Sequence, residues 1–117
     1  MDICFEGIGQ VIATFQAEDE ALATGTTVKL KGSGIVEVGN ENDLLCGVTV
    51  GAVRNGAVAV QVGGVVKVKY SDAEPAVGWT ALVCDGDGGV KTTGDAGGMK
   101  CLVLAVDKGE QTAVIKL

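Results

Sequence analysis

Residues that could do chemistry are few in this chain of 117 residues. It has no histidine, the side chain whose ordinary pKa best suits general acid–base catalysis near neutral pH. Its serines, Ser33 and Ser71, lie outside any G-x-S-x-G motif, and neither has an obvious base to activate its hydroxyl. We therefore expect no catalytic residue and no enzymatic activity.

The cysteines are the remaining candidates for nucleophilic or metal chemistry. They are Cys4, Cys46, Cys84 and Cys101, and no two of them form a C-x-x-C pair. A structural zinc site usually draws its ligands from such close pairs. The last three lie in runs rich in valine and leucine, where cysteine packs as a small apolar side chain. We expect four free thiols, no metal site and no cofactor.

The stretch Asp85–Gly89, DGDGG, has the composition of a metal-binding loop. A calcium loop of the EF-hand type needs a ligand at its fifth position and an acidic residue at its twelfth, where this chain has Gly89 and Ala96. Asp85 and Asp87 would suit a glycosidase, but a small chain with one tryptophan offers no sugar-binding cleft. Asp and Gly are residues that tight turns favour, so the stretch predicts a turn.

The overall charge is acidic, with a net value of −6. A nucleic-acid partner would require a basic footprint and aromatic platforms, and aromatic residues make up only 3% of the chain. No apolar run approaches the roughly 20 residues of a membrane span. The segment Met1–Gln10 lacks the basic start of a secretory signal. We expect no nucleic-acid partner, no membrane association and synthesis in the cytoplasm.

The element that organises the chain is Ala57–Tyr70, AVAVQVGGVVKVKY. Its even positions are apolar, whereas its odd positions become polar at Lys67 and Lys69, a period of two that is typical of strands with one face on a core. Gly63-Gly64 either bends one long strand or separates two strands of the same register. The residues expected to be buried on a common side are Val58, Val60, Val62, Val66 and Val68, with Leu102 and Leu104 packed against them.

Further strands are predicted by short β-branched runs between glycine-rich turns. The expected strands are Gly9–Phe15, Thr26–Lys31, Ile35–Val38, Leu44–Val50, Trp79–Cys84, Val90–Thr93, Lys100–Val106 and Gln111–Leu117. Lys100–Val106 is apolar enough to be buried on both faces, and Asn55-Gly56 predicts a tight hairpin. At most one or two helical turns are expected, near Glu18–Ala23 and Asp72–Val77. The pattern predicts an all-β fold, a small barrel or a tight sandwich of short strands.

The two halves of the chain are weakly similar. Gly25-Thr26-Thr27 is matched by Gly78-Trp79-Thr80 (78 − 25 = 53), and Gly56 is matched by Gly109 at the same spacing (109 − 56 = 53). One interpretation is a single β domain over residues 1–117 built from two similar halves. The alternative is a chance match between segments rich in valine and glycine.

The second half resembles the small capsid decoration, or cement, proteins of tailed phages and prophages, related to the head-decoration proteins of lambda-like phages. The motifs that carry the resemblance are Gly64-Val65, Lys67 and Lys69, Ala76–Trp79, and Lys91-Thr92-Thr93; in the first half they are Ala21–Gly25, Val28-Lys29-Leu30 and Gly47-Val48. The resemblance covers residues 8–117. Trp79 departs from the pattern, because a charged or small residue is commoner at that position.

This resemblance implies a non-enzymatic structural protein of the virion. Members bind the outside of the capsid lattice, often as trimers, and stabilise it. The implied partner is the major capsid protein of a tailed phage, with a homotrimer as the assembled form, made in the cytoplasm of the bacterial host and located on the capsid surface. The family has no active site to carry over.

The aromatic residues are candidates for the contacts of such a protein, because aromatic side chains are enriched at interface centres. Phe5, Tyr70 and Trp79 are the candidate interface residues, although Tyr70 and Trp79 could instead fill the end of a barrel. For Met1–Ile8 two interpretations stay open. It is a flexible N-terminal arm that adds a strand to a neighbouring subunit or the capsid, or it is the loose start of the strand Gly9–Phe15.

Two other functions are consistent with the sequence. A small β-barrel binding module for carbohydrate or a partner protein is the first, although Trp79 and Tyr70 are its only candidate aromatic contacts. A tail or baseplate subunit of a phage is the second, and sequence alone does not separate it from a head protein.

Overall fold

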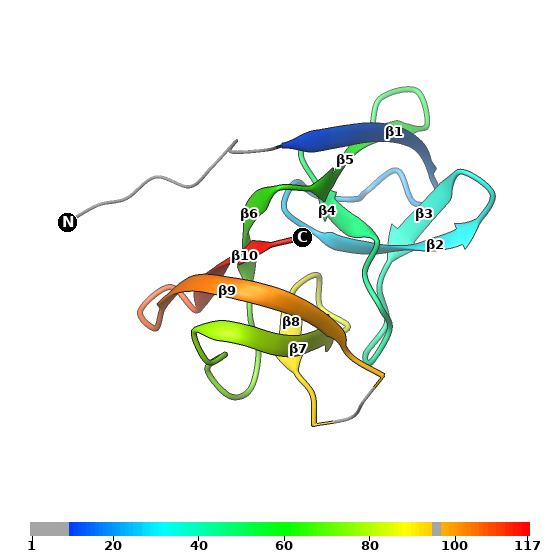
Figure 1. Cartoon of the computed structure of the whole chain (residues 1–117). Coiled ribbons are helices and arrows are strands. Elements are labelled where there is room, and N and C mark those ends of the chain that lie inside the picture. The colour runs from blue at the N-terminus through cyan, green and yellow to red at the C-terminus, as the bar shows by residue number, and fades with distance from the viewer. Residues whose placement is uncertain (1–9, 95–96) are drawn as a thin grey trace.

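The computed structural model describes residues 10–94 and 97–117, which form ten strands and no helix (Figure 1). The first half contains β1 (Val11–Ala17), β2 (Thr27–Gly32), β3 (Ile35–Val38), β4 (Gly47–Thr49) and β5 (Ala57–Gly63). The second half contains β6 (Val65–Lys69), β7 (Gly78–Cys84), β8 (Val90–Thr92), β9 (Met99–Asp107) and β10 (Thr112–Lys116). The predicted all-β fold is confirmed.

The first half is a closed barrel with the strand order β1-β3-β2-β4-β5. β1 pairs antiparallel with β5 along most of its length, and it pairs parallel with β3 only at Gln16 and Ala17. Alternating side chains of these strands point inward and build a first core. The buried residues of this first core are Ala17, Leu22, Val28, Val36, Val58 and Val60.

The second half is a five-stranded sheet with the order β6-β10-β9-β7-β8. Its end strands meet only at an isolated parallel bridge between Tyr70 and Val90. The sheet curls around a second core, to which the first half contributes Leu45 and Val48. The other buried residues of this second core are Val66, Val68, Tyr70, Leu82, Cys84, Val90, Cys101, Val103, Ala113 and Ile115.

The two halves share one topology. Read around the closed barrel in the other direction, the order of the first half is β1-β5-β4-β2-β3, which matches β6-β10-β9-β7-β8 strand for strand. Backbone hydrogen bonds repeat as well. Ala17 N donates to Gly56 O at 2.8 Å, and Tyr70 N donates to Gln111 O at 3.0 Å. These donors are 70 − 17 = 53 positions apart and these acceptors 111 − 56 = 55. The prediction of two similar halves is confirmed.

The halves are joined by backbone hydrogen bonds at the end of β7. Cys84 N donates to Asp43 O at 2.8 Å, and Asn42 N donates to Cys84 O at 3.0 Å. Thr27 Oγ1 donates to Gly89 O at 2.8 Å in a buried position. Gly39 is required here, because a β-carbon at this residue would collide with the side chain of Cys84. The two halves therefore pack directly against each other.

The central stretch forms two strands that separate at Gly64, whose φ of 88° is in the left-handed region. The predicted register is confirmed, since Val66 and Val68 are buried while Lys67 and Lys69 are exposed. The prediction of a common buried side is wrong. Val58 and Val60 belong to the first core, whereas Val66 and Val68 belong to the second, because the chain changes sheet at Gly64.

Val62 is only half-buried, against the first core. The prediction for β9 is wrong in its side-chain direction and in its burial on both faces. Leu102 and Leu104 are half-buried, and Cys101 and Val103 occupy the core instead. Lys100, which is exposed at the start of this run, lies on the same face as Leu102 and Leu104 and marks it as the outer face. The prediction missed this signal because it treated the run as apolar throughout.

The turns follow the sequence closely. Asn55 and Gly56 have φ values of 52° and 77°, and Arg54 and Ala57 on either side exchange both backbone hydrogen bonds. This is the predicted tight hairpin. The segments near Glu18–Ala23 and Asp72–Val77 form turns and irregular backbone without a helix. Within residues 10–94 and 97–117, no helix is long and apolar enough to cross a membrane.

Candidate functional site

The Asp85 carboxylate holds the β7–β8 turn together. Its Oδ1 accepts hydrogen bonds from the backbone N–H groups of Asp87 at 2.7 Å and Gly89 at 2.9 Å, and its Oδ2 accepts from the Ser71 hydroxyl at 2.6 Å. Gly86 and Gly88 both have a φ of 87°, which side chains disfavour. DGDGG is therefore a turn, as predicted, and the Asp85 side chain holds it together. The hydroxyl of Ser71 is engaged in the same set of hydrogen bonds.

The thiols are placed as small core side chains. Cys84 and Cys101 are buried, Cys46 is half-buried, and all three are free. Burial raises the pKa of each of these thiols above its ordinary value, which keeps them protonated and weakly nucleophilic. Cys4 lies outside the described residues. In the described part of the chain, His, Cys, Asp and Glu side chains form no group of three that could hold a metal ion.

A cavity of about 290 Å³ lies where the two halves meet. Gln61, which is buried, stands in its wall together with Thr49, Val65 and Lys67. The Gln61 amide nitrogen donates to Gly63 O and Val65 O at 3.0 Å each, and its oxygen accepts from Gln10 Nε2 at 3.2 Å. These hydrogen bonds hold the side chain of Gln61 at the β5–β6 junction.

The three candidate interface residues have different surroundings. Trp79, at the start of β7, is 66% exposed, and its cross-strand neighbour on β9 is Leu102. Tyr70 is 6% exposed and belongs to the second core, where it lies beside Val90, so little of its side chain is at the surface of the single chain. Phe5 lies outside the described residues. Trp79 is thus the candidate that the structure places at the surface, with Val77 exposed two residues before it.

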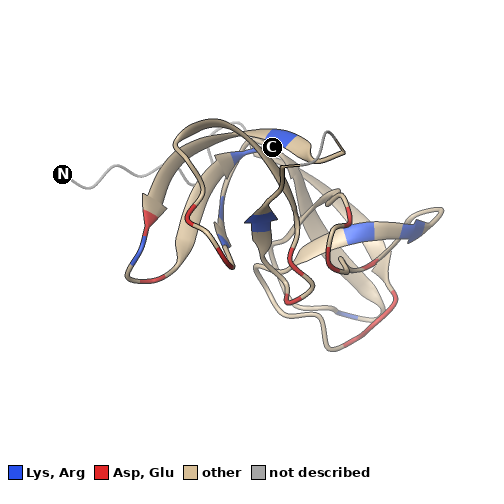
Figure 2. Cartoon of the chain, turned by 90° about the horizontal axis from the view of Figure 1, so that it is seen from below, with Lys and Arg blue, Asp and Glu red and all other residues tan. Residues whose placement is uncertain are grey.

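Charged side chains are distributed over both halves with the two signs interspersed (Figure 2). Several are paired within the chain, as Lys29 is with Asp43 at 2.7 Å and Lys91 with Glu41 at 2.7 Å. The hydrogen bond from Lys29 lowers the pKa of the Asp43 carboxyl below its ordinary value. Lys91 and Glu41 belong to opposite halves, so this pair adds to the junction between them.

Comparison with protein-family models and with curated proteins found no match. The site has therefore to be judged on its own geometry. Sequence analysis did not anticipate the exposure of Val11 and Ile12 on β1, because alternation predicts one inward and one outward residue there, and both are exposed. The signal for Trp79 was its departure from the pattern of the resembled family.

Proposed function

We propose that this protein is a non-enzymatic structural protein that binds the outer surface of a tailed-phage capsid and stabilises it. The major capsid protein is its proposed partner, a homotrimer its proposed assembled form and the capsid surface of the virion its proposed location. The resemblance in sequence supports this proposal, and the confirmed all-β fold is compatible with it. Exposed Trp79 on a rigid sheet is the observation that carries it.

A protein that braces a lattice needs a stiff body and a defined contact, because its role is to resist deformation. The fold supplies stiffness, since its turns are fixed by hydrogen bonds such as those of Asp85 and Asp43. The symmetry of a lattice repeats one contact many times, so each contact can be weak. These properties favour a structural role without any demand for reactive groups.

Trp79 suits the centre of such a contact. Exposed tryptophan in water is unfavourable, and burying a tryptophan at an interface often contributes a large part of the binding energy. Trp79 is held on β7, whose neighbour β9 pairs with it from Gly78 to Leu82, so the ring is presented by regular sheet instead of a loop. Val77, 70% exposed, extends the apolar surface.

The test is binding of the purified protein to phage heads from the same prophage that lack it, measured by co-sedimentation and electron microscopy. We expect wild-type protein to decorate heads, and Trp79→Ala to bind roughly thirtyfold or more weakly with an unchanged melting temperature. Leu44→Ala, which removes a 54% exposed side chain from the first half, is the matched control. Wild-type protein that binds tails but not heads would instead support the tail or baseplate function, and binding to neither would refute both.

A further inference from the structure

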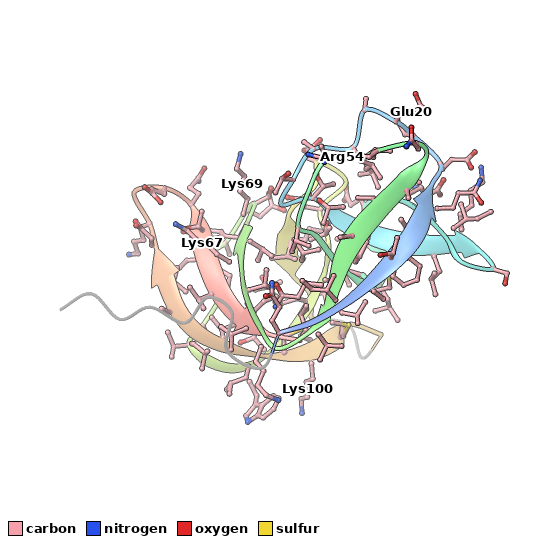
Figure 3. All side chains as sticks on the ribbon, turned by 90° about the horizontal axis from the view of Figure 1, so that it is seen from above. Glu20, Arg54, Lys67, Lys69 and Lys100 are labelled. Atoms are coloured by element: carbon pink, nitrogen blue, oxygen red, sulfur yellow. The ribbon has the colours of Figure 1, made fainter. Side chains whose placement is uncertain are left out.

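The first strand of the barrel, β1, leaves part of one edge unpaired. It pairs with β5 from Val11 to Gln16, but on its other side β3 reaches only Gln16 and Ala17. Figure 3 shows β5 running along one side of β1, while the beginning of β1 has no described strand on the other side. Among the described residues, the edge of Val11–Phe15 away from β5 thus has no strand partner.

Backbone alternation identifies the groups on this edge. Gln16 N donates to Gly34 O and Glu18 N donates to Val36 O, so the even-numbered residues point toward β3. Ala17 N donates to Gly56 O on the opposite side. Since successive residues of a strand direct their N–H and C=O groups to opposite sides, those of Ile12 and Thr14 lie on the open edge. A row of such groups is a template for another strand.

The equivalent strand of the second half, β6, also has an edge with little strand pairing among the described residues. It pairs with β10 along its length, and on its other side the bridge between Tyr70 and Val90 lies just beyond its end. At a spacing of 53 positions, Thr14 corresponds to Lys67 (67 − 14 = 53) and Gln16 corresponds to Lys69 (69 − 16 = 53). Both lysines are exposed and project away from the sheet (Figure 3). Lysine on an edge strand opposes the addition of a further strand, because pairing would bury or crowd its charge. β6 is protected in this way, and β1 has no charged residue.

The exposed side chains of β1 also favour the addition of another strand at this edge. Val11 is 55% and Ile12 48% exposed, and the pairing of β1 with β5 shifts register between them, so both aliphatic side chains lie at the surface. A second copy of the same strand would cover both without bringing like charges together. We propose that β1 pairs antiparallel with β1 of a second copy, so that the two barrels form one continuous sheet across a two-fold axis.

The register follows from the space that β3 leaves. Residues whose backbone groups lie on the open edge must face each other, and Gln16 is already taken by Gly34. The register that places Ile12 opposite Ile12 of the second copy, and Gln10 opposite Thr14, satisfies both conditions. A register that places Gln10 opposite Ile12 satisfies them too, but it pairs fewer of the described residues, so we take the former. This contact uses neither Trp79 nor a capsid, so it does not depend on the proposed function.

The test is sedimentation equilibrium of the free protein up to about 1 mM, with hydrogen exchange as a second readout. We expect a dimer, and concentration-dependent protection of the amides of Ile12 and Thr14. Thr14→Lys combined with Gln16→Lys gives β1 the protection of β6 and should weaken association about tenfold or more. Ala52→Lys combined with Ala73→Lys adds the same charge at exposed positions outside β1 and β3 and should leave association unchanged.

The reciprocal exchange tests the same idea by gain of association. Lys67→Thr combined with Lys69→Gln removes the protection of β6, and we expect species larger than a dimer. A wild-type protein that stays monomeric up to the highest concentration would overturn the proposal. So would any association, as a dimer or as a trimer, that is insensitive to the lysines on β1. Protection of the Ile12 amide without any concentration dependence would show that the edge is covered within one chain.

Discussion

The two halves have the same strand order, but they close in different ways. In the first half β1 joins β5 by a long antiparallel ladder and reaches β3 through two parallel pairs, so backbone hydrogen bonds complete the barrel. In the second half the end strands meet at the single bridge Tyr70–Val90. The second core is completed by Leu45 and Val48 of the first half. The first half is thus closed by its own backbone hydrogen bonds, whereas the core of the second half is completed by side chains of the first.

The turn between β2 and β3 differs in the same sense from its counterpart between β7 and β8. The β2–β3 turn, Gly32–Gly34, is exposed. The β7–β8 turn, Asp85–Gly89, is tied by the Asp85 carboxylate and bonded to Thr27 in the first half. The turn held by its own aspartate is therefore the one that is bonded to the other half, whereas the β2–β3 turn is bonded to β1 through Gly34 O.

The largest effect is expected from the two cores, through Leu82 and its counterpart Val28, both fully buried (82 − 28 = 54). Leu82→Ala should lower the free energy of unfolding by about 2–5 kcal/mol and Val28→Ala by about 2 kcal/mol, from lost burial and the cavity left behind. Urea unfolding followed by Trp79 fluorescence and by circular dichroism measures both. Because the second core includes Leu45 and Val48 of the first half, we expect the two signals to coincide, and separate midpoints would show that the halves unfold independently.

A smaller effect is expected at the junction, where Gly39 of the first half corresponds to Thr93 of the second (93 − 39 = 54). Gly39→Thr should cost about 1–3 kcal/mol, because the new β-carbon meets Cys84. Gly51→Thr is the matched control, since a β-carbon there would meet nothing within 4 Å. Cys84→Ala should recover part of the loss in a double-mutant cycle. Equal costs at Gly39 and Gly51 would contradict the close packing of the halves.

The smallest effect is expected in acid, at Asp43, whose pKa is lowered by the hydrogen bond from Lys29. A carboxyl with a lowered pKa in the folded state stabilises the fold above its unfolded pKa of about 3.9, and this contribution disappears as the pH falls through the folded value. Asp43→Asn should therefore reduce stability at neutral pH slightly and flatten its decline below about pH 4. Glu20→Gln, at an exposed position, should leave that decline as it is in the wild type.

Much of the fold was predictable where polar residues mark a face. Lys67 and Lys69 fixed the direction of β6, and Asn55-Gly56 located a hairpin. The direction of Leu102 and Leu104 was predicted wrongly, although Lys100 on the same face of β9 is a polar residue that distinguishes its faces. The assignment of Val58 and Val66 to one side failed for a different reason. Alternation describes a strand locally, and it does not register that Gly64 moves the chain to another sheet.

The candidate site was predictable only in part. Asp85 and the glycines around it could be recognised as a turn from their residue types. The separation of Tyr70 from Trp79 could not, because the burial of an aromatic residue depends on which strands close over it. The open edge of β1 was also hidden, since it follows from how far β3 extends along its neighbour.

The second core depends on Leu45 and Val48 of the first half, which limits how this chain can be divided. If the halves descend from one repeated unit, they no longer retain its autonomy, because an excised second half would lack part of its own interior. The passage from β5 to β6 through Gly64 alone leaves no hinge at which the chain could be divided. The two halves, although similar in strand order, therefore form one folding unit.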